Sequence, residues 1–134
     1  MRLVKNSEEH WEFIRLLRNN PIVKKGFIEQ GHISIMDQDA YMSKYGDHYY
    51  VCLIGSMRVG YIGEIDLDIR LAVHPAFQQL GVGLFMLDAF MKIEPEATAK
   101  VLVGNEASKK LFLSSGFEKT GGDEYFDFFK KKKQ

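Results

Sequence analysis

The stretch that most constrains the fold is AVHPAFQQLGVGLFML, residues 72–87, which joins an apolar run to a long hydrophobic segment. It holds Gly81 and Gly83 at the point where a helix is expected to begin. A glycine in or beside a helix costs about 0.5–1 kcal/mol relative to alanine, so the pair requires a compensating role. Close approach of a ligand to the backbone would be such a role.

The segments on either side of the two glycines predict a strand, a turn and a helix. Asp68–Val73 reads as a strand that ends at His74-Pro75, because the residue before proline stays extended and proline cannot donate to a strand ladder. Val82–Lys92 is apolar almost all round, which is typical of a helix buried against a sheet. The unpaired amides and positive dipole of that helix start would form a site for an anion such as phosphate.

Two common phosphate loops do not fit these residues. A dinucleotide-binding G-x-G-x-x-G that starts at Gly81 would require glycine at Met86, and the lysine and hydroxyl residue of a Walker loop are missing. Gln78, Gly81 and Gly83 fit Q-x-x-G-x-G instead.

The rest of the chain alternates between helical and strand-like patterns. A helix capped by Asn6 and Glu9 follows a first strand, and tyrosine-rich and β-branched runs follow a second helix. This order predicts an α/β (α+β) domain with a mixed, mostly antiparallel sheet and helices on both faces. The expected elements are strand 2–5, helix 6–20, helix 37–45 closed by Gly46, hairpin 49–63, strand 99–103, helix 106–115 ended by Gly116, and two last strands that turn at Gly121–Gly122.

Composition narrows the classes of function. At 134 residues and 46% hydrophobic, residues 1–134 fit one domain, with residues 130–134 as a disordered lysine tail. Lysine plus arginine equals aspartate plus glutamate at 18 each, which gives no electrostatic reason to expect nucleic acid or membrane partners. A lone Cys52 in an apolar run indicates a buried residue in a reducing, cytoplasmic protein. We expect a monomer or homodimer.

Over Tyr49–Phe117 the sequence resembles the GNAT superfamily of acyl-CoA-dependent N-acetyltransferases. The resemblance rests on the hairpin, on RLAVHPAFQQLGVGLFML as strand, loop and helix, and on KVLVGNEASKKLFLSSGF, which is similar to the family's second block of Asn, Ala or Ser, an aromatic and Gly-Phe. It implies a GNAT-like sheet of about six or seven strands and acetyl-CoA (coenzyme A) as cofactor.

The resemblance also implies a set of cofactor contacts. The amides of Gln79–Gly83 would hold the pyrophosphate, and Leu71 and Val73 would pair their backbone with pantetheine as an added strand. The Val73 amide would bond the thioester carbonyl, where negative charge develops during attack by an amine. Asn105 would bond the pantetheine amides, cap the following helix, or do both. The implied cofactor residues are Leu71, Ala72, Val73, Gln78, Gln79, Leu80, Gly81, Val82, Gly83, Leu84, Asn105, Ser108 and Phe112.

The residues for proton transfer are less clearly marked. A protonated amine needs a base, and Asp68 and Asp66 are the candidates, although alternation along the strand puts them on the face opposite Val73. The family's frequent acid is a tyrosine, and Phe112 stands at the matching position.

Two groups of residues are candidates for contact with the acceptor. Arg18-Asn19 resembles a pair found in transferases that act on amino-sugar nucleotides or protein N termini. His32, His48 and Tyr45 lie in segments expected to border the acceptor site.

Three classes of function follow from these residues. The first is an acetyl-CoA-dependent N-acetyltransferase that passes acetyl directly to a primary amine of a small molecule, an amino-sugar nucleotide or a peptide. The second is an acyl-CoA-binding module with little or no turnover. The third is a phosphate- or nucleotide-binding protein unrelated to coenzyme A.

Overall fold

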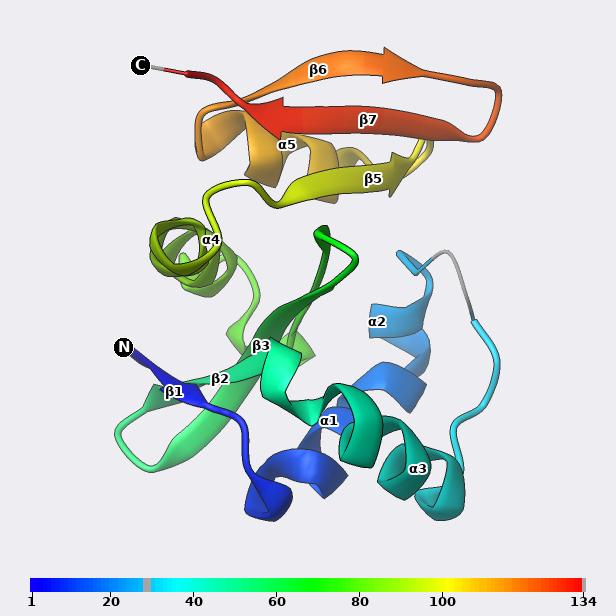
Figure 1. The fold of residues 1–134 in the computed structure, drawn as a ribbon, viewed down its shortest axis with the longest axis vertical. Helices are drawn as coiled ribbons and strands as arrows, with labels where there is room; N and C mark the ends of the chain where they lie inside the picture. Colours follow the sequence, from blue (N-terminus) through cyan, green and yellow to red (C-terminus); the bar gives the residue numbers. More distant parts are fainter. Residues whose placement is uncertain (28–29, 134) are drawn as a thin grey trace.

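The computed structural model describes residues 1–27 and 30–133, which form a seven-stranded sheet with helices on both of its faces (Figure 1). The strand order is β1-β2-β3-β4-β5-β7-β6. The strands are β1 Arg2–Lys5, β2 Tyr49–Ile54, β3 Met57–Ile65, β4 Asp68–Val73, β5 Thr98–Leu102, β6 Phe117–Gly122 and β7 Phe126–Lys131.

Strand direction follows the sequence-based expectation of a mixed, mostly antiparallel sheet. Every neighbouring pair is antiparallel except β4 and β5, which run parallel. The predicted hairpin is β2 and β3, and its turn includes Gly55 with a φ of +61°.

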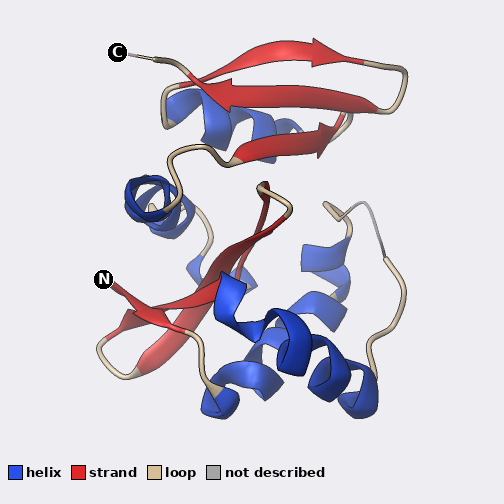
Figure 2. Ribbon diagram, in the orientation of Figure 1, coloured by secondary structure: helices blue, strands red, loops and turns tan. Residues whose placement is uncertain are grey.

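Helices cover both faces of the strands, as Figure 2 shows. The N-terminal helices and α4 lie on opposite sides of β2–β4 in Figure 1, and α5 packs beside β6. The helices are α1 Trp11–Asn19, α2 Pro21–Lys24, α3 Ile35–Tyr45, α4 Val82–Ile93 and α5 Glu106–Ser114.

Two hydrophobic cores sandwich the sheet because side chains alternate between its faces. On the α4 and α5 face, Met86 and Phe90 pack with Ile62 of β3 and Ile69 of β4. On the other face, Ile14 and Leu17 of α1 pack on β2 and β3. Cys52 is fully buried and burial raises the pKa of its thiol, as expected of a packing residue.

The first helix begins differently from the prediction. Asn6 does not cap it, because its side-chain amide donates to the Gly46 carbonyl at 3.1 Å and so ties the end of β1 to the end of α3. A 3₁₀ turn at Glu8–His10 leads into α1 instead. Gly46 does end α3, but with a right-handed φ of −55° rather than as a left-handed glycine cap.

The C-terminal hairpin turns later than predicted. Gly121 and Gly122 belong to β6, beside a register shift between Lys119 and Gly121, and the chain reverses between Asp123 and Phe126. The Asp123 carboxylate accepts hydrogen bonds from the amides of Tyr125 and Phe126, so an aspartate organises the turn.

The predicted lysine tail also needs correction. Lys130 and Lys131 lie within β7, where Lys130 pairs with Glu118 of β6 on one side and Thr98 of β5 on the other. This pairing holds both lysines in the sheet, so a disordered tail from residue 130 is wrong for these two positions. Gln134 lies outside the described residues.

None of the helices in the described ranges has the length and apolarity that a membrane crossing requires.

Candidate functional site

The candidate site lies where β4 and β5 separate. The two strands share one Cα pair, Asp68 with Thr98, and the Thr98 amide donates to the Leu67 carbonyl at 2.8 Å. Beyond this point β5 pairs with β7, and β4 pairs only with β3 among the described strands. Residues 69–73 therefore have one edge of backbone that no strand covers in the described part of the chain.

The backbone of Leu71 and Val73 faces this uncovered edge. In an antiparallel ladder alternate residues point their amide and carbonyl groups at the partner strand. His74 donates to the Val59 carbonyl of β3 at 2.8 Å, so the groups of Val73 and Leu71 point the other way. The Val73 carbonyl accepts a 3.4 Å hydrogen bond from the Gln78 side chain on that side.

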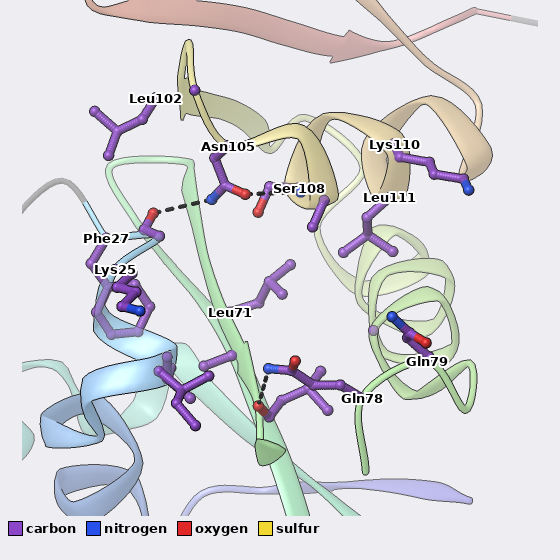
Figure 3. A pocket seen from close by; sticks show the side chains of 18 of the residues that line it. Lys25, Phe27, Leu71, Gln78, Gln79, Leu102, Asn105, Ser108, Lys110 and Leu111 are labelled. Atoms are coloured by element: carbon purple, nitrogen blue, oxygen red, sulfur yellow. Dashed lines mark hydrogen bonds between the residues drawn. The ribbon is translucent and has the colours of Figure 1, made fainter. Parts of the chain in front are cut away.

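A cleft of about 1330 Å³ opens along this edge between β4, α4 and α5 (Figure 3). Eleven of the residues implied as cofactor contacts line it, namely Leu71, Ala72, Val73, Gln78, Gln79, Gly81, Val82, Gly83, Leu84, Asn105 and Ser108. The structure puts the other two elsewhere. Leu80 is 62% exposed and Phe112 lines a neighbouring cavity.

The start of α4 forms one end of the cleft. Its N-cap, Gly81, has a φ of +81° and provides no side-chain cap, and Gln79 also has a positive φ of +64°. The first four amides of a helix have no acceptor within the helix, so they are free to bind a ligand. Together with the helix dipole, they make this end of the cleft suitable for an anion.

The two glycines of the motif serve different purposes. A Cβ at Gly81 would meet no atom within 4 Å, so its positive φ is what requires glycine. A Cβ at Gly83 would lie 3.2 Å from Leu111 and 3.7 Å from Val73, so this position lets α4 approach α5 and β4 closely.

Two lysines that the motif reasoning missed also line the cleft. Lys25 follows α2 and Lys110 lies on α5, so the cleft brings together cations from distant parts of the chain. Figure 3 shows both side chains beside the cleft. No spacing in the sequence links them, because each reaches the cleft through a different helix.

Asn105 connects two sides of the site. Its Oδ1 accepts from the Ser108 amide at 3.2 Å, which confirms that it caps α5, and its Nδ2 donates to the Gly26 carbonyl at 3.3 Å. A Cβ on Gly26 would lie 2.7 Å from that Nδ2, so a glycine is needed for the approach. Both amide atoms are thus engaged within the protein.

A second cavity of about 170 Å³ lies on the face of β4 covered by the N-terminal helices. It shares Gly26, Phe27, Leu71, Asn105 and Ser108 with the cleft, so the two spaces meet at the gap between β4 and β5. Its remaining lining residues are Arg18, Tyr49, Tyr61, Asp68, Ile69, Arg70, Lys100, Val101 and Phe112.

Asp68 enters the second cavity, whereas Asp66 does not line either space. Burial raises the pKa of the Asp68 carboxyl, against the opposing effect of Arg70 and Lys100. The strand alternation expected from the sequence holds, because Asp68 and Arg70 project opposite to Leu71 and Val73. Asp66 lies in the exposed turn before β4, with a φ of +51°.

The predicted Arg18-Asn19 pair divides between two roles. Arg18 lines the second cavity, with its guanidinium 4.9 Å from the centre of the Tyr41 ring. Asn19 lies outside the lining of both spaces and exchanges two 2.8 Å hydrogen bonds with the backbone of Ile33. These bonds give Asn19 a structural role in holding the segment before α3.

His32, Tyr45 and His48 lie outside the lining of both spaces, whereas Phe112 lines the second cavity. His48 pairs with Glu64 at 2.6 Å and packs edge-on against Tyr45, and His32 is exposed. Phe112 is 5% exposed, and its ring contacts Phe117 and stacks on Phe129. Tyr49 and Tyr61 of the cavity were missed, because aromatic residues in strands are typical of a core.

Several solved structures have the same fold. A spermidine N-acetyltransferase from Vibrio cholerae, in complex with CoA and spermine, is 16% identical with a TM-score of 0.81, over 96% of this chain and 92% of that one. A ribosomal-protein-alanine N-acetyltransferase from Brucella melitensis is 15% identical with a TM-score of 0.78, over 96% and 97%. A Salmonella typhimurium protein with its cofactor acetyl-CoA is 16% identical with a TM-score of 0.78, over 96% and 90%.

These likenesses establish that the chain has the fold of the GNAT N-acetyltransferases, as the sequence motifs implied. No protein-family model matches the sequence, and no curated protein gives a significant match.

Proposed function

We propose that this protein transfers the acetyl group of acetyl-CoA to a primary amine of a small molecule or a peptide. The observation that carries the proposal is the uncovered backbone edge of Leu71 and Val73, which leads along one cleft to the uncapped start of α4. Neighbours of the same fold that hold CoA or acetyl-CoA support this reading of the cleft.

The cleft residues fit the parts of coenzyme A. The amides of Gln79–Gly83 would hold the pyrophosphate at the start of α4, and Lys25 and Lys110 are further cations in the lining of the cleft. The backbone groups of Leu71 and Val73 would bond the pantetheine amides as a strand would. Asn105 would join them through its second Nδ2 hydrogen, because the first is donated to the Gly26 carbonyl.

The acetyl thioester would supply a carbonyl carbon that an amine can attack, with a C–N bond formed and the C–S bond broken. The Val73 amide points toward the gap and would donate to the carbonyl oxygen as negative charge develops on it. One such donor is worth about 2.7–4 kcal/mol in comparable oxyanion sites.

Asp68 is the residue we propose as the base. It lines the cavity that meets the cleft, and the raised pKa of its carboxyl makes it a better proton acceptor than an exposed aspartate. It would take the proton that the amine loses, directly or through water. The departing thiolate needs no acid from Phe112, because the thiol pKa is modest enough for it to leave ionised.

An acyl-CoA-binding module with little turnover is the alternative. Phe112 favours it, because a buried phenylalanine between Phe117 and Phe129 occupies the position where the resemblance implies a tyrosine acid.

Two measurements test the proposal. Coenzyme A at about 100 times its Kd should add about 2.7 kcal/mol to the free energy of unfolding, and this is read as a thermal shift. No shift at millimolar acetyl-CoA would contradict cofactor binding. Free thiol release across a panel of amines, including spermidine, amino-sugar nucleotides and peptides, then separates a transferase from a binding module. Amine-dependent release supports the transferase, and acetyl-CoA binding without release supports the alternative.

A further inference from the structure

Positive side chains outnumber negative ones in the lining of the second cavity. Among its described lining residues are three cations, Arg18, Arg70 and Lys100, and one carboxylate, Asp68. If Asp68 receives the amine of an acceptor, the cations remain as neighbours for the rest of that molecule. A second amine there would be repelled, while an anionic group would be attracted.

The Arg70 guanidinium has N–H donors that can bind a ligand. Its Nε forms an ion pair with the Asp68 carboxylate at 3.4 Å, and the Arg70 side chain is 41% exposed. Its other N–H groups make no hydrogen bond with the described residues, so they are available to a bound oxyanion. The guanidinium can also bind a carboxylate through two parallel N–H donors.

Arg18, from α1, adds a second guanidinium to the lining of the cavity. It stacks on Tyr41 and makes no hydrogen bond or ion pair with any side chain that the structure describes. Both Arg18 and Arg70 act on the buried Tyr61 hydroxyl, where they oppose the rise in its pKa that burial causes. The two guanidiniums and the Tyr61 hydroxyl belong to residues that line the same cavity.

From this arrangement we propose that the acceptor is a small amino acid-like molecule, with a carboxylate that Arg18 and Arg70 bind while Asp68 receives the amine. This inference rests on the proposed function, which it narrows from any primary amine to an amine with an anionic group. The volume of about 170 Å³ favours a short chain between the amine and the carboxylate. Lys100 also lines the cavity, is an exposed residue, and has its Nζ 5.0 Å from the centre of the Phe126 ring.

The test compares each amino carboxylate with its neutral amide. Glycine, 3-aminopropanoate and 4-aminobutanoate are measured against their amides and against 1,4-diaminobutane, with kcat/KM from thiol release and Kd from calorimetry with and without saturating coenzyme A. A charged hydrogen bond to a guanidinium corresponds to about tenfold or more in binding, so we expect at least one carboxylate to exceed its amide by that factor.

Substitution of each arginine tests whether it causes the preference for a carboxylate over its amide. Arg18→Gln and Arg70→Gln should each reduce the carboxylate-to-amide ratio about tenfold, mainly through KM. Arg2→Gln, at an exposed position of β1, is the control and should keep the ratio. Arg18→Gln is the more specific test of the anion site, because Arg70 also lowers the pKa of Asp68 and its replacement would alter the proposed base.

The outcomes separate this inference from the proposed function. Absence of a thermal shift with coenzyme A contradicts the function, whereas tighter binding of a carboxylate than its amide by the protein alone still supports the anion site. If no carboxylate is preferred over its amide in turnover or in binding, or if the diamine is preferred, the inference is overturned.

Discussion

The cleft and the second cavity meet at the same gap in the sheet but are built in opposite ways. The proposed anion-binding end of the cleft would use backbone amides from a single continuous stretch, Gln79–Gly83, in which Gln79 and Gly81 have a positive φ. The cavity is lined by residues from α1, from six positions on β2, β3 and β4, and from β5 and α5. One space depends on local conformation and the other on long-range packing.

Under the proposed function, the cleft would recognise the cofactor and the cavity would recognise the acceptor. A backbone cradle at a helix start can bind the same phosphate groups whatever the neighbouring side chains are. A cavity lined by side chains changes its preference with each substitution. Perturbation of one space should therefore change cofactor affinity with little effect on acceptor selection, and the reverse should hold for the other.

The largest effect is expected in the cavity. Asp68→Asn removes the proposed base and should lower kcat at least about 100-fold, while the Kd of coenzyme A stays within a few fold. Activity of the wild type should fall as pH decreases through the raised pKa of Asp68, because the base must be ionised, and the variant should lack that limb. The measurement is the pH profile of thiol release.

Asp66→Asn is the matched control for this variant. Asp66 lies two residues earlier in an exposed turn, outside the lining of both spaces. Equal loss of rate in the two variants would show that Asp68 acts through strand structure or overall charge rather than as a base.

The next effect is expected at the start of α4. Gly81→Val forces a β-branched residue into a left-handed conformation, which costs about 1–2 kcal/mol, and it disturbs the amides that would hold the pyrophosphate. The Kd of coenzyme A, measured by calorimetry, should rise about tenfold. Acceptor preference should not change.

Gly31→Val is the control for Gly81→Val, since a Cβ at Gly31 meets nothing within 4 Å and its φ is not left-handed. Gly83→Val should act mainly through packing, because its Cβ would press on Leu111. Unchanged coenzyme A affinity in a folded variant with both Gly81 and Gly83 replaced would refute the anion-binding role of this turn.

The same contrast explains what the sequence could predict. The strand, turn and helix around Gly81 follow from local patterns, and so does the cap at Asn105, because each depends on residues within a few positions. The cavity joins Arg18 to Arg70 and Lys100 through the sheet, and no local pattern encodes such distances. Asp68 was placed correctly by strand alternation, but its neighbours in the cavity depended on the packing of α1.

Local sequence patterns also mispredicted a turn and a helix cap. The predicted turn at Gly121–Gly122 was wrong because glycine also occurs beside register shifts, as it does here in β6. Asn6 has the residue type of a helix cap, but a partner 40 positions away, the Gly46 carbonyl, takes its side chain. A polar residue with two suitable partners cannot be assigned from its immediate neighbours alone.

A smaller effect is expected at Asn105, which belongs to both spaces. Asn105→Ala removes the cap of α5 and should lower the free energy of unfolding by about 1 kcal/mol, whereas Asn105→Ser keeps a capping hydroxyl. Both variants lose the bond to Gly26 and should alter coenzyme A affinity only a few fold. Thermal melts and calorimetry check the two effects, and equal melts for Ala and Ser would contradict the capping role.

The smallest effect is expected at Phe112, where the cavity meets the core. If the protein is a transferase whose thiolate leaves ionised, the Phe112 ring only fills space beside Phe117 and Phe129, and Phe112→Tyr should keep turnover within a few fold. If it is a binding module that lacks an acid at this position, the new hydroxyl should raise a near-zero rate by about 100-fold, the lower range for a positioned acid. The comparison uses thiol release with the best acceptor of the panel, and thermal melts check that the added hydroxyl does not disturb the core. A wild-type rate equal to buffer together with a large gain in the tyrosine variant would reject the transferase, because Phe112 would then be the residue that prevents catalysis.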